Sequence, residues 1–368
     1  MQNFLWLKSY KSITLDTQVE MREGMTVMSE AMLRGNQNNP VRVSARCWDR
    51  AGMEAVGDAF RYALSENALS EIEAAIGFCR RNGLTSETVE QEDFRIPSFA
   101  SDVASLHQQL DAGRGFVVIG GLDTSRYSDD EAGIIAWGLG NYLGRPVRQG
   151  LHTDRRMFTV TDTGGKNTDP TRIGASSKRS AMHSDNGCLE RRPPCYIGLL
   201  CVKTAVKGGD SMLISAETVH EVVERERPDL LPLLYETWDF RPPVLHTWPD
   251  GPKTIRKPIF ERDSGELRIH YARVMIEPGM ELAGTPLTDR QREALDYFDS
   301  VLERRDLYFS FVLRQGEFLV TNNLVNLHGR EAFATDSAGG RILKRIWMWR
   351  RHVGAGDNPV ALDAAEMR

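Results

Sequence analysis

Short apolar runs recur along the second half of this chain, and they constrain its fold more than any other feature. Each run is rich in aliphatic, β-branched or aromatic residues and is bounded by Gly, Asp or Pro, as is typical of strands. They predict a β-sandwich or barrel. The runs are residues 196–202 (YIGLLCV), 211–215 (SMLIS), 267–276 (LRIHYARVMI), 308–313 (YFSFVL), 317–323 (EFLVTNN) and 341–349 (RILKRIWMW).

Helical patterns precede and interrupt these runs. In residues 65–82 apolar side chains recur at helical spacing, with Ser65 as the expected N-cap and Gly83 as the expected stop. These patterns indicate a mainly β fold with flanking helices (α+β) and an N-terminal helical region. Further helices are expected at 101–112, 129–143, 216–235 and 288–304, a buried strand at 115–121 (GFVVIGG), and long loops at 155–180.

The chain is expected to divide into four parts. Residues 1–40 form a leader without clear periodicity, where Met21, Met25 and Met28 leave the start site open. Residues 41–93 form a helical region that packs on the β domain, residues 94–352 form that domain, and residues 353–368 form a tail. The leader is expected to be flexible.

Composition narrows the class of partner. The 368 residues carry a net charge of −5, so no overall positive field favours nucleic acid or an anionic membrane. The five cysteines show no CxxC pair, and no apolar run is long enough to span a bilayer. We therefore expect a cytoplasmic protein that binds a small molecule. Its oligomeric state is not readable, and a homo-oligomer stays open.

Three residues form a candidate metal site. His183 and Asp185 lie two positions apart, on one face if the segment is extended, and His328 follows far along the chain. Two imidazoles and one carboxylate leave coordination positions open on one side of an ion, as in Fe(II) oxygenases. A His-x-Asp pair alone is a weak signal, because chance often produces it. Arg341 and Arg345 follow in an apolar strand, where both are expected to share one face.

The segments AMHSDNG (181–187), LLCVKTAVKGGDSMLIS (199–215) and NNLVNLHGREAF (322–333) with the trailing RILKR (341–345) resemble the taurine dioxygenase-like family. The resemblance spans about residues 94–351 and implies a double-stranded β-helix, a jelly-roll barrel. It also implies Fe(II) as cofactor, with 2-oxoglutarate and O2 as cosubstrates, and oxidation of an unactivated C–H bond coupled to release of succinate and CO2.

Carried over position by position, the resemblance gives roles to several residues. His183, Asp185 and His328 match the metal ligands, and Arg341 matches the arginine that pairs with the distal carboxylate of 2-oxoglutarate. Arg345 is expected to share that carboxylate or to clamp the substrate. Ser211 stands where relatives place a threonine that hydrogen-bonds the cosubstrate.

Substrate contacts are assigned on weaker grounds. Arg179 precedes the HxD segment, and Tyr271 and Arg273 are expected on one strand face, where an arginine would bind an anionic or zwitterionic substrate. Each of these arginines could equally be an ordinary surface charge. Asn323 is expected to orient a loop or touch substrate. His270 fits a structural histidine better than a fourth ligand.

The reaction outcome stays open at this point. Hydroxylation of an amino acid or related carboxylate is the default, with desaturation or oxidative cyclisation by the same mechanism as alternatives. Asp185 argues against halogenation, because halogenating relatives have a small residue there. A non-catalytic metal or ligand binder and a zinc hydrolase are the alternatives from other classes.

Overall fold

The computed structural model describes residues 45–147, 149, 155–162, 176–185, 193–242, 253–335 and 340–350. The predicted leader (residues 1–40) and tail (residues 353–368) lie outside these residues. The proposed division at residue 94 stays a prediction.

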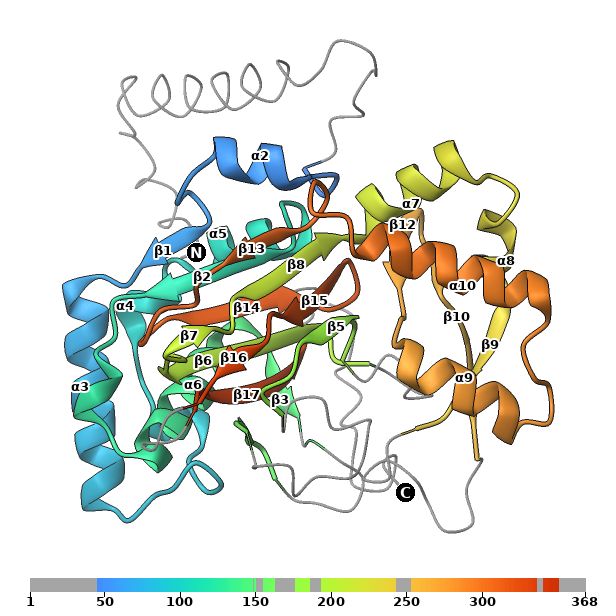
Figure 1. Cartoon of the computed structure of the whole chain (residues 1–368). Helices are drawn as coiled ribbons and strands as arrows, with labels where there is room; N and C mark the ends of the chain where they lie inside the picture. Colours follow the sequence, from blue (N-terminus) through green and yellow to red (C-terminus); the bar gives the residue numbers. More distant parts are fainter. Residues whose placement is uncertain are drawn as a thin grey trace, which may run out of the picture.

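Two larger β-sheets, flanked by two groups of helices, form the body of the described chain (Figure 1). The larger, seven-stranded sheet has the order β1-β2-β14-β6-β17-β3, with β4 also paired to β17, and the smaller has the order β13-β8-β15-β5. The larger sheet holds β1 (Arg61–Ala63), β2 (Phe116–Gly120), β3 (Arg145–Val147), β4 (Phe158–Val160), β6 (Tyr196–Lys203), β14 (Phe318–Asn322) and β17 (Ile342–Trp349). The smaller sheet holds β5 (Ser180–His183), β8 (Ser211–Ser215), β13 (Phe309–Phe311) and β15 (Asn326–Arg330).

Three further strand pairs lie outside these sheets. They are β7 (Lys207–Gly208) with β16 (Phe333–Ala334), β9 (Thr237–Phe240) with β10 (Ile255–Pro258), and β11 (Phe260–Asp263) with β12 (Glu266–Ile269).

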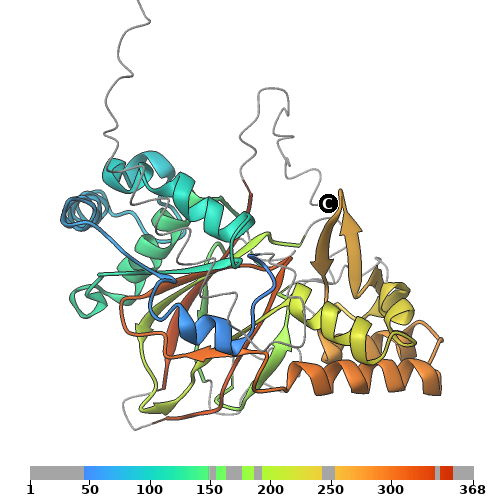
Figure 2. The ribbon, with the colours of Figure 1, turned by 90° about the horizontal axis from the view of Figure 1, so that it is seen from above.

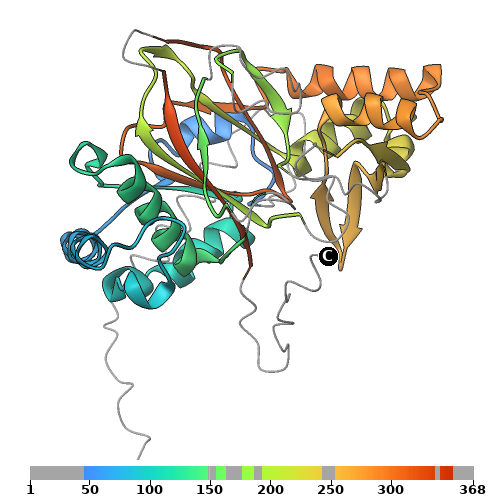
Figure 3. The same cartoon turned by 90° about the horizontal axis from the view of Figure 1, so that it is seen from below.

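The helices lie at the two flanks of the sheets, as Figures 2 and 3 show from above and below. One flank holds α3 (Glu66–Arg81), α4 (Pro97–Ala100), α5 (Val103–Asp111) and α6 (Asp129–Leu143), with the short η1 (Gln91–Asp93) and η2 (Thr124–Arg126). The other flank holds α7 (Ala216–Glu226), α8 (Leu231–Tyr235), α9 (Arg273–Leu282) and α10 (Asp289–Leu302), while α2 (Arg50–Ala55) lies near β13.

Alternation along the strands builds a layered core. In β2, Phe116 and Val118 join a cluster that also holds Leu213 of the smaller sheet, so the two sheets pack face to face. Val117 and Ile119 point the other way, into a cluster with α3, α5 and α6. The outer face of the smaller sheet packs in the same way against α7 and α10. The central strands β2, β8 and β14 are therefore buried on both faces along nearly their whole length, whereas β5 and β13 alternate between buried and exposed residues.

Several predicted elements are confirmed to within a few residues. The helix after Ser65 begins at Glu66, with the Ser65 side chain accepting from the Ala68 amide, and Gly83 beyond its end has a φ of 65°. The helix predicted at 129–143 has these bounds, and Ser128 forms a capping box with Glu131. The mixed helix and sheet composition predicted from the sequence is thus observed.

Three predicted elements are wrong. The first is the loop expected at 155–180, because its described part contains the strand β4. The helix expected at 216–235 is broken into α7 and α8, because Pro228 lacks an amide proton and disfavours helical geometry at Arg227. The strand expected at 267–276 ends at Ile269, and Arg273 begins α9. The buried residues of α9 recur at helical spacing: Met275, Ile276, Gly279 and Met280. The sequence did not reveal this helix, because a short apolar run fits a buried helix as well as a strand.

None of the helices in the described ranges is long and apolar enough to cross a membrane.

Four of the cysteines are free thiols: Cys47, Cys79, Cys195 and Cys201.

Candidate metal centre and cosubstrate pocket

Two neighbouring strands of the smaller sheet bring the two candidate histidine ligands together. His183 ends β5, and His328 lies in the middle of β15 directly opposite it in the antiparallel register. Cross-strand neighbours on one face lie close to each other, and the two imidazole centroids are 4.5 Å apart. Residues 145 positions apart in the sequence thus form one site.

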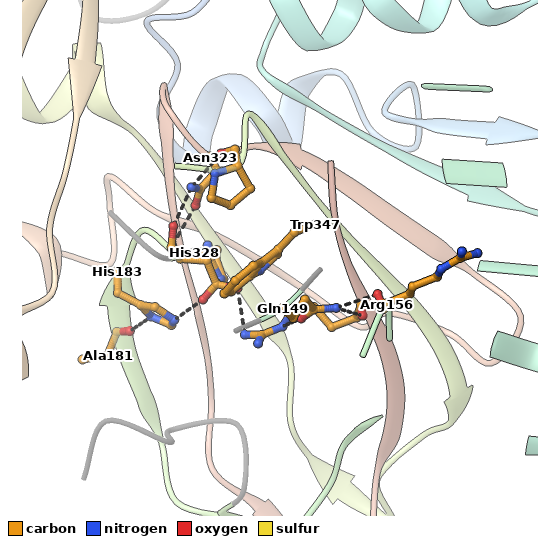
Figure 4. A network of polar contacts seen from close by, with 10 residues as sticks. Gln149, Arg156, Ala181, His183, Asn323, His328 and Trp347 are labelled. Atoms are coloured by element: carbon orange, nitrogen blue, oxygen red, sulfur yellow. Dashed lines mark hydrogen bonds and ion pairs between the residues drawn. The ribbon is translucent and has the colours of Figure 1, made fainter. Parts of the chain in front are cut away.

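Asp185 completes the group from the loop after β5. Its amide donates to Asn323 Oδ1 at 2.8 Å, and Asn323 Nδ2 donates to the Asp185 carbonyl at 2.8 Å. Asn323 Nδ2 also donates to the Pro194 carbonyl at 3.1 Å. The buried Asn323 amide therefore fixes the Asp185 backbone from both sides (Figure 4).

The three side chains present ligand atoms to a common point. Asp185 Oδ1 lies 3.5 Å from His183 Nε2 and 3.8 Å from His328 Nε2, and one ligand atom from each residue lies within 4.8 Å of the others. His183 Nδ1 lies 2.8 Å from the Ala181 carbonyl oxygen, which can only accept a proton (Figure 4). The proton of neutral His183 therefore sits on Nδ1, and Nε2 keeps a lone pair for a metal.

The second carboxylate oxygen of Asp185 is occupied by protein donors. Arg345 Nη1 donates to Oδ2 at 2.8 Å, and Trp347 Nε1 donates to the same oxygen at 2.9 Å. With Oδ2 held in this way, Oδ1 is the oxygen left to face the histidines. The geometry favours a carboxylate that binds an ion through one oxygen and leaves the open face unblocked.

The protonation states suit metal binding. Burial alone would raise the pKa of Asp185, but Arg345 and the two histidines hold it well below its usual value. Burial, followed by the neighbouring His183, lowers the pKa of His328 to about 3. The carboxylate is thus ionised and the His328 imidazole neutral at physiological pH, and a neutral imidazole and a carboxylate are the forms that bind a metal.

A cavity between the two sheets lies beside these ligands. It is partly open to solvent, and its walls combine the apolar inner face of the larger sheet with polar residues. Its lining includes Leu199, Leu319, Leu343, Ser211, Arg330, Arg341 and Arg345 together with the three candidate ligands.

Arg341 is the most buried cation of this cavity. Its Nη2 donates to Ser211 Oγ at 3.3 Å, and no carboxylate of the described residues lies within ion-pair distance of it. Burial lowers its pKa to about 10, so the guanidinium remains charged at neutral pH. A buried and uncompensated cation is costly, and an anionic ligand would remove that cost.

Comparison with known proteins places this site in a family. The family model "Taurine catabolism dioxygenase TauD, TfdA family" matches residues 81–347. This chain belongs to the TauD, TfdA family of dioxygenases. The family resemblance inferred from the sequence is confirmed, and so is the prediction of a non-haem Fe(II)/2-oxoglutarate-dependent dioxygenase.

Relatives of this TauD, TfdA family member include FR-33289 synthase of Streptomyces rubellomurinus (strain ATCC 31215), 27% identical over 310 residues that cover 82% of this chain and 88% of the relative. Taurine hydroxylase-like protein SAT17 of Stachybotrys chartarum (strain CBS 109288 / IBT 7711) is 28% identical over 290 residues, covering 74% of this chain and 70% of the relative.

Solved structures show the same fold. Asparagine oxygenase in complex with Fe(II), 2S,3S-3-hydroxyasparagine and succinate aligns with a TM-score of 0.62 and 17% identity, covering 79% of this chain and 93% of that one. The non-haem iron oxygenase OrfP in complex with Fe and alpha-ketoglutaric acid aligns with a TM-score of 0.57 and 15% identity, covering 78% of this chain and 93% of that one.

The structure places the other predicted site residues unequally. Ser211, Arg341 and Arg345 line the cavity with the ligand group. Asn323 is buried behind Asp185 and braces its backbone, which agrees with the expected loop-orienting contact.

Tyr271 and Arg273 do not lie on one strand face, contrary to the sequence expectation. Tyr271 is buried in the core cluster near α10, and its hydroxyl donates to Asp299. Arg273, at the start of α9, forms ion pairs with Glu277, Asp296 and Asp299 at 2.5, 2.7 and 3.0 Å. Neither residue is among those lining the cavity.

Arg179 is also not among the residues that line the cavity. Its guanidinium forms ion pairs with Glu303 at 2.7 Å and with Glu331 at 3.4 Å. Carboxylates of this protein therefore already neutralise both arginines proposed for substrate, Arg179 and Arg273.

Sequence reasoning missed three residues of the site. Trp347 and Gln149 contact Asp185 and Arg345, and Arg330 lines the cavity. Gln149 Oε1 accepts from Arg345 Nε at 3.0 Å, while its Nε2 donates to the carbonyls of Arg345 and Arg156 at 2.7 and 3.1 Å. The one signal available was spacing: Trp347 lies two positions beyond Arg345, on the same strand face.

The low pKa of His328 predicts a pH dependence of stability in the metal-free protein. His328 takes up its proton near pH 6.5 when unfolded but only near pH 3 when folded. The free energy of unfolding that the neutral His328 contributes is fully present above pH 6.5. It is lost as the pH falls from 6.5 toward 3, by about 1.4 kcal/mol per pH unit. Denaturant unfolding at several pH values should show a shallower slope in His328→Gln; an equal slope in both proteins would contradict the assignment.

Asn323→Ala is expected to destabilise the fold and to weaken metal binding. Removing the amide leaves the buried Asp185 N–H and C=O without partners, at about 1–3 kcal/mol for each unsatisfied group. Asn322→Ala is the matched control, because Asn322 is equally buried but bonds to Leu110. Both variants should lose unfolding free energy, but only Asn323→Ala should bind Fe(II) more weakly. Equal Fe(II) affinities would show that Asn323 has no part in positioning the ligand.

Proposed function

We propose that this enzyme hydroxylates an unactivated C–H bond of a small anionic or zwitterionic molecule, such as an amino acid or related carboxylate. The observation that carries the proposal is the cavity in which the His183, Asp185 and His328 ligand group lies beside the uncompensated Arg341 guanidinium. We assign the two packed sheets to a double-stranded β-helix (jelly roll), with the metal between them.

His183 Nε2, His328 Nε2 and Asp185 Oδ1 would hold Fe(II), and the clustering of these atoms fits a single ion. Arg341 and Ser211 would bind the distal carboxylate of 2-oxoglutarate at the inner end of the cavity. Together with O2, bound iron and 2-oxoglutarate would supply the oxidant that removes hydrogen from the substrate, and 2-oxoglutarate would leave as succinate and CO2.

Of the two roles expected for Arg345, the contact with the cosubstrate carboxylate and the substrate clamp, we assign it the second. Its Nη1 bonds to Asp185 and its Nε to Gln149, and its guanidinium lies over the rings of Phe158 and Trp347 at 5.1 and 4.7 Å. The two hydrogen bonds hold the Nε and Nη1 edge of the guanidinium against Asp185 and Gln149, and the two rings pack against the guanidinium. We assign the remaining Nη2 to an anionic group of the substrate, which would then lie next to the open face of the metal.

The remaining walls exclude water from the reacting bond. Leu199, Leu319 and Leu343 line the cavity opposite the ligand group, so a bound substrate would replace water there with apolar surface. The protein would thus position the substrate and exclude water from the reacting bond, and the cofactor would supply the oxidising chemistry.

Relatives support a small polar substrate. Asparagine oxygenase was solved with 2S,3S-3-hydroxyasparagine, and uridine-5'-phosphate dioxygenase of Streptomyces sp is 28% identical over 212 residues, covering 55% of this chain and 73% of the relative. Arg345 is the cation in this cavity that would meet either a carboxylate or a phosphate.

Substrate screening by succinate release tests the proposal, with Asp185→Ala and Arg341→Ala as inactive references. Mass spectrometry of the product then decides the outcome of the reaction. A gain of one oxygen supports hydroxylation, whereas a loss of two hydrogens would replace it with desaturation or oxidative cyclisation. Activity that persists without O2 would instead indicate a hydrolase.

A further inference from the structure

Arg330 is a cavity cation to which the proposed mechanism gives no task. It lies two residues after His328 on β15, and alternation puts both side chains on the cavity side of that strand. Its side chain is buried, and its backbone is in register with Ser211 on β8. Ser211 is the residue whose hydroxyl accepts from Arg341. Arg330, Ser211 and Arg341 therefore gather at one end of the cavity.

The protein holds the Arg330 guanidinium in place without neutralising it. Its Nη2 donates to the carbonyls of Ser176, at 2.7 Å, and Lys178, and the group lies 4.6 Å from the centroid of the Phe333 ring. No carboxylate of the described residues lies within ion-pair distance. Its Nε is buried and has no hydrogen-bond partner. A buried donor without a partner is uncommon in a folded protein and indicates a place for a ligand atom or a water.

Two buried guanidiniums line this cavity, and the charge of each disfavours the other. Burial and then the charge of Arg341 lower the pKa of Arg330 to about 10, and the charge of Asp162 opposes this. Like charges in a poorly solvated cavity repel, and an anion between them would relieve both the repulsion and the burial of each charge. Both guanidiniums remain charged at neutral pH.

The position along the strand matches the length of the cosubstrate. A step of two residues on a strand is about 7 Å, so Arg330 lies about that far from the metal ligand His328. A five-carbon keto diacid that binds a metal through its keto-acid end carries its second carboxylate at the far end of the chain. That carboxylate would reach the end of the cavity where Arg330 and Arg341 gather.

We propose that Arg330 is a second cosubstrate-binding cation, and that Arg330 and Arg341 together bind the distal carboxylate of 2-oxoglutarate, with Ser211 between them. The inference rests on the proposed function, and it assigns to Arg330 the carboxylate contact that was one of the two roles expected for Arg345. A carboxylate held by two guanidiniums makes the enzyme selective for a keto acid with a distal carboxylate. Keto acids that lack this group lose both ion pairs.

Anaerobic titration of the Fe(II)-loaded protein with two keto acids tests this assignment. 2-Oxoglutarate has the distal carboxylate, whereas 2-oxopentanoate has the same number of carbons without it. Arg330→Met should weaken 2-oxoglutarate binding about ten- to a hundredfold, as expected for a lost charged hydrogen bond, and change 2-oxopentanoate binding less than twofold. Arg61→Met is the matched control, because Arg61 also stacks on a phenylalanine but ion-pairs with Glu317 outside the cavity.

Three outcomes would overturn the assignment. Equal weakening of both keto acids would mean that Arg330 acts only by bracing the carbonyls of Ser176 and Lys178, and unchanged binding of both would mean that it has no role. If Arg330→Met fails to fold, Arg330→Lys provides the test, because lysine keeps the charge but lacks the planar guanidinium fork. Its affinity for 2-oxoglutarate should fall while its affinity for 2-oxopentanoate stays unchanged. Equal changes in both affinities would overturn the assignment. Wild-type protein that binds neither keto acid would instead reject the proposed function itself.

Discussion

Asp185→Ala is expected to abolish product formation, with succinate release falling at least about a thousandfold. The substitution removes the Oδ1 ligand from the point where two imidazole Nε2 atoms meet. It also leaves Arg345 and the Trp347 indole without the acceptor that each now uses. Fe(II) affinity should fall by at least about a hundredfold, more than is usual for loss of a supporting contact. Fe(II) titration and a succinate assay measure the two effects.

The control for Asp185→Ala is Asp239→Ala. Asp239 is a buried aspartate of β9 that accepts from Thr254 and lies outside the cavity lining. Its replacement should lower stability but leave Fe(II) binding unchanged. If Asp185→Ala bound Fe(II) as tightly as the wild type and released succinate at the same rate, the ligand assignment would be wrong.

Arg341→Met is expected to weaken 2-oxoglutarate binding about ten- to a hundredfold, because it removes a buried charged donor. Methionine keeps most of the side-chain volume, so the cavity should not collapse. The variant should unfold at an equal or higher temperature, since it removes a buried cation that has no carboxylate partner among the described residues. Cosubstrate titration and thermal unfolding provide the two measurements.

Lys344→Met is the matched control for Arg341→Met. Lys344 is another buried cation, three residues further along, but its ammonium faces away from the cavity and bonds to Asp129 and Thr159. It should lose stability and keep its affinity for 2-oxoglutarate. The opposite pattern, with affinity lost in Lys344→Met and kept in Arg341→Met, would place the cosubstrate elsewhere.

The parts of the fold that the sequence predicts are those set by local chemistry. Ser65, Ser128 and Thr288 each cap the helix expected after them, because a side-chain oxygen accepts a nearby amide in the first turn. The metal site was also predictable, since His183 and Asp185 are neighbours and His328 stands in a recognisable family context. Sheet order was beyond reach, because β6 pairs with β14 and β17 across more than a hundred residues.

The predicted substrate contacts depended on tertiary structure that the sequence does not contain. Tyr271 and Arg273 alternate as strand residues would, but the backbone of Tyr271 bonds to Ser184 and the chain then turns into α9. Whether an arginine is free depends on its neighbours: Arg273 meets three carboxylates, whereas Arg341 meets none within the described ranges. Gln149 belongs to the site because its side chain accepts a hydrogen bond from Arg345, which lies 196 residues further along the chain.

The most direct test of the central claim is an anaerobic titration of the wild-type protein with Fe(II) and then 2-oxoglutarate, followed by admission of O2. Bidentate binding of the keto acid to a metal held by His183, Asp185 and His328 should produce a weak visible charge-transfer band, and air should then yield succinate. The band should be absent from Asp185→Ala. Absence of both the band and succinate in the wild type, with all three ligands intact, would contradict the account.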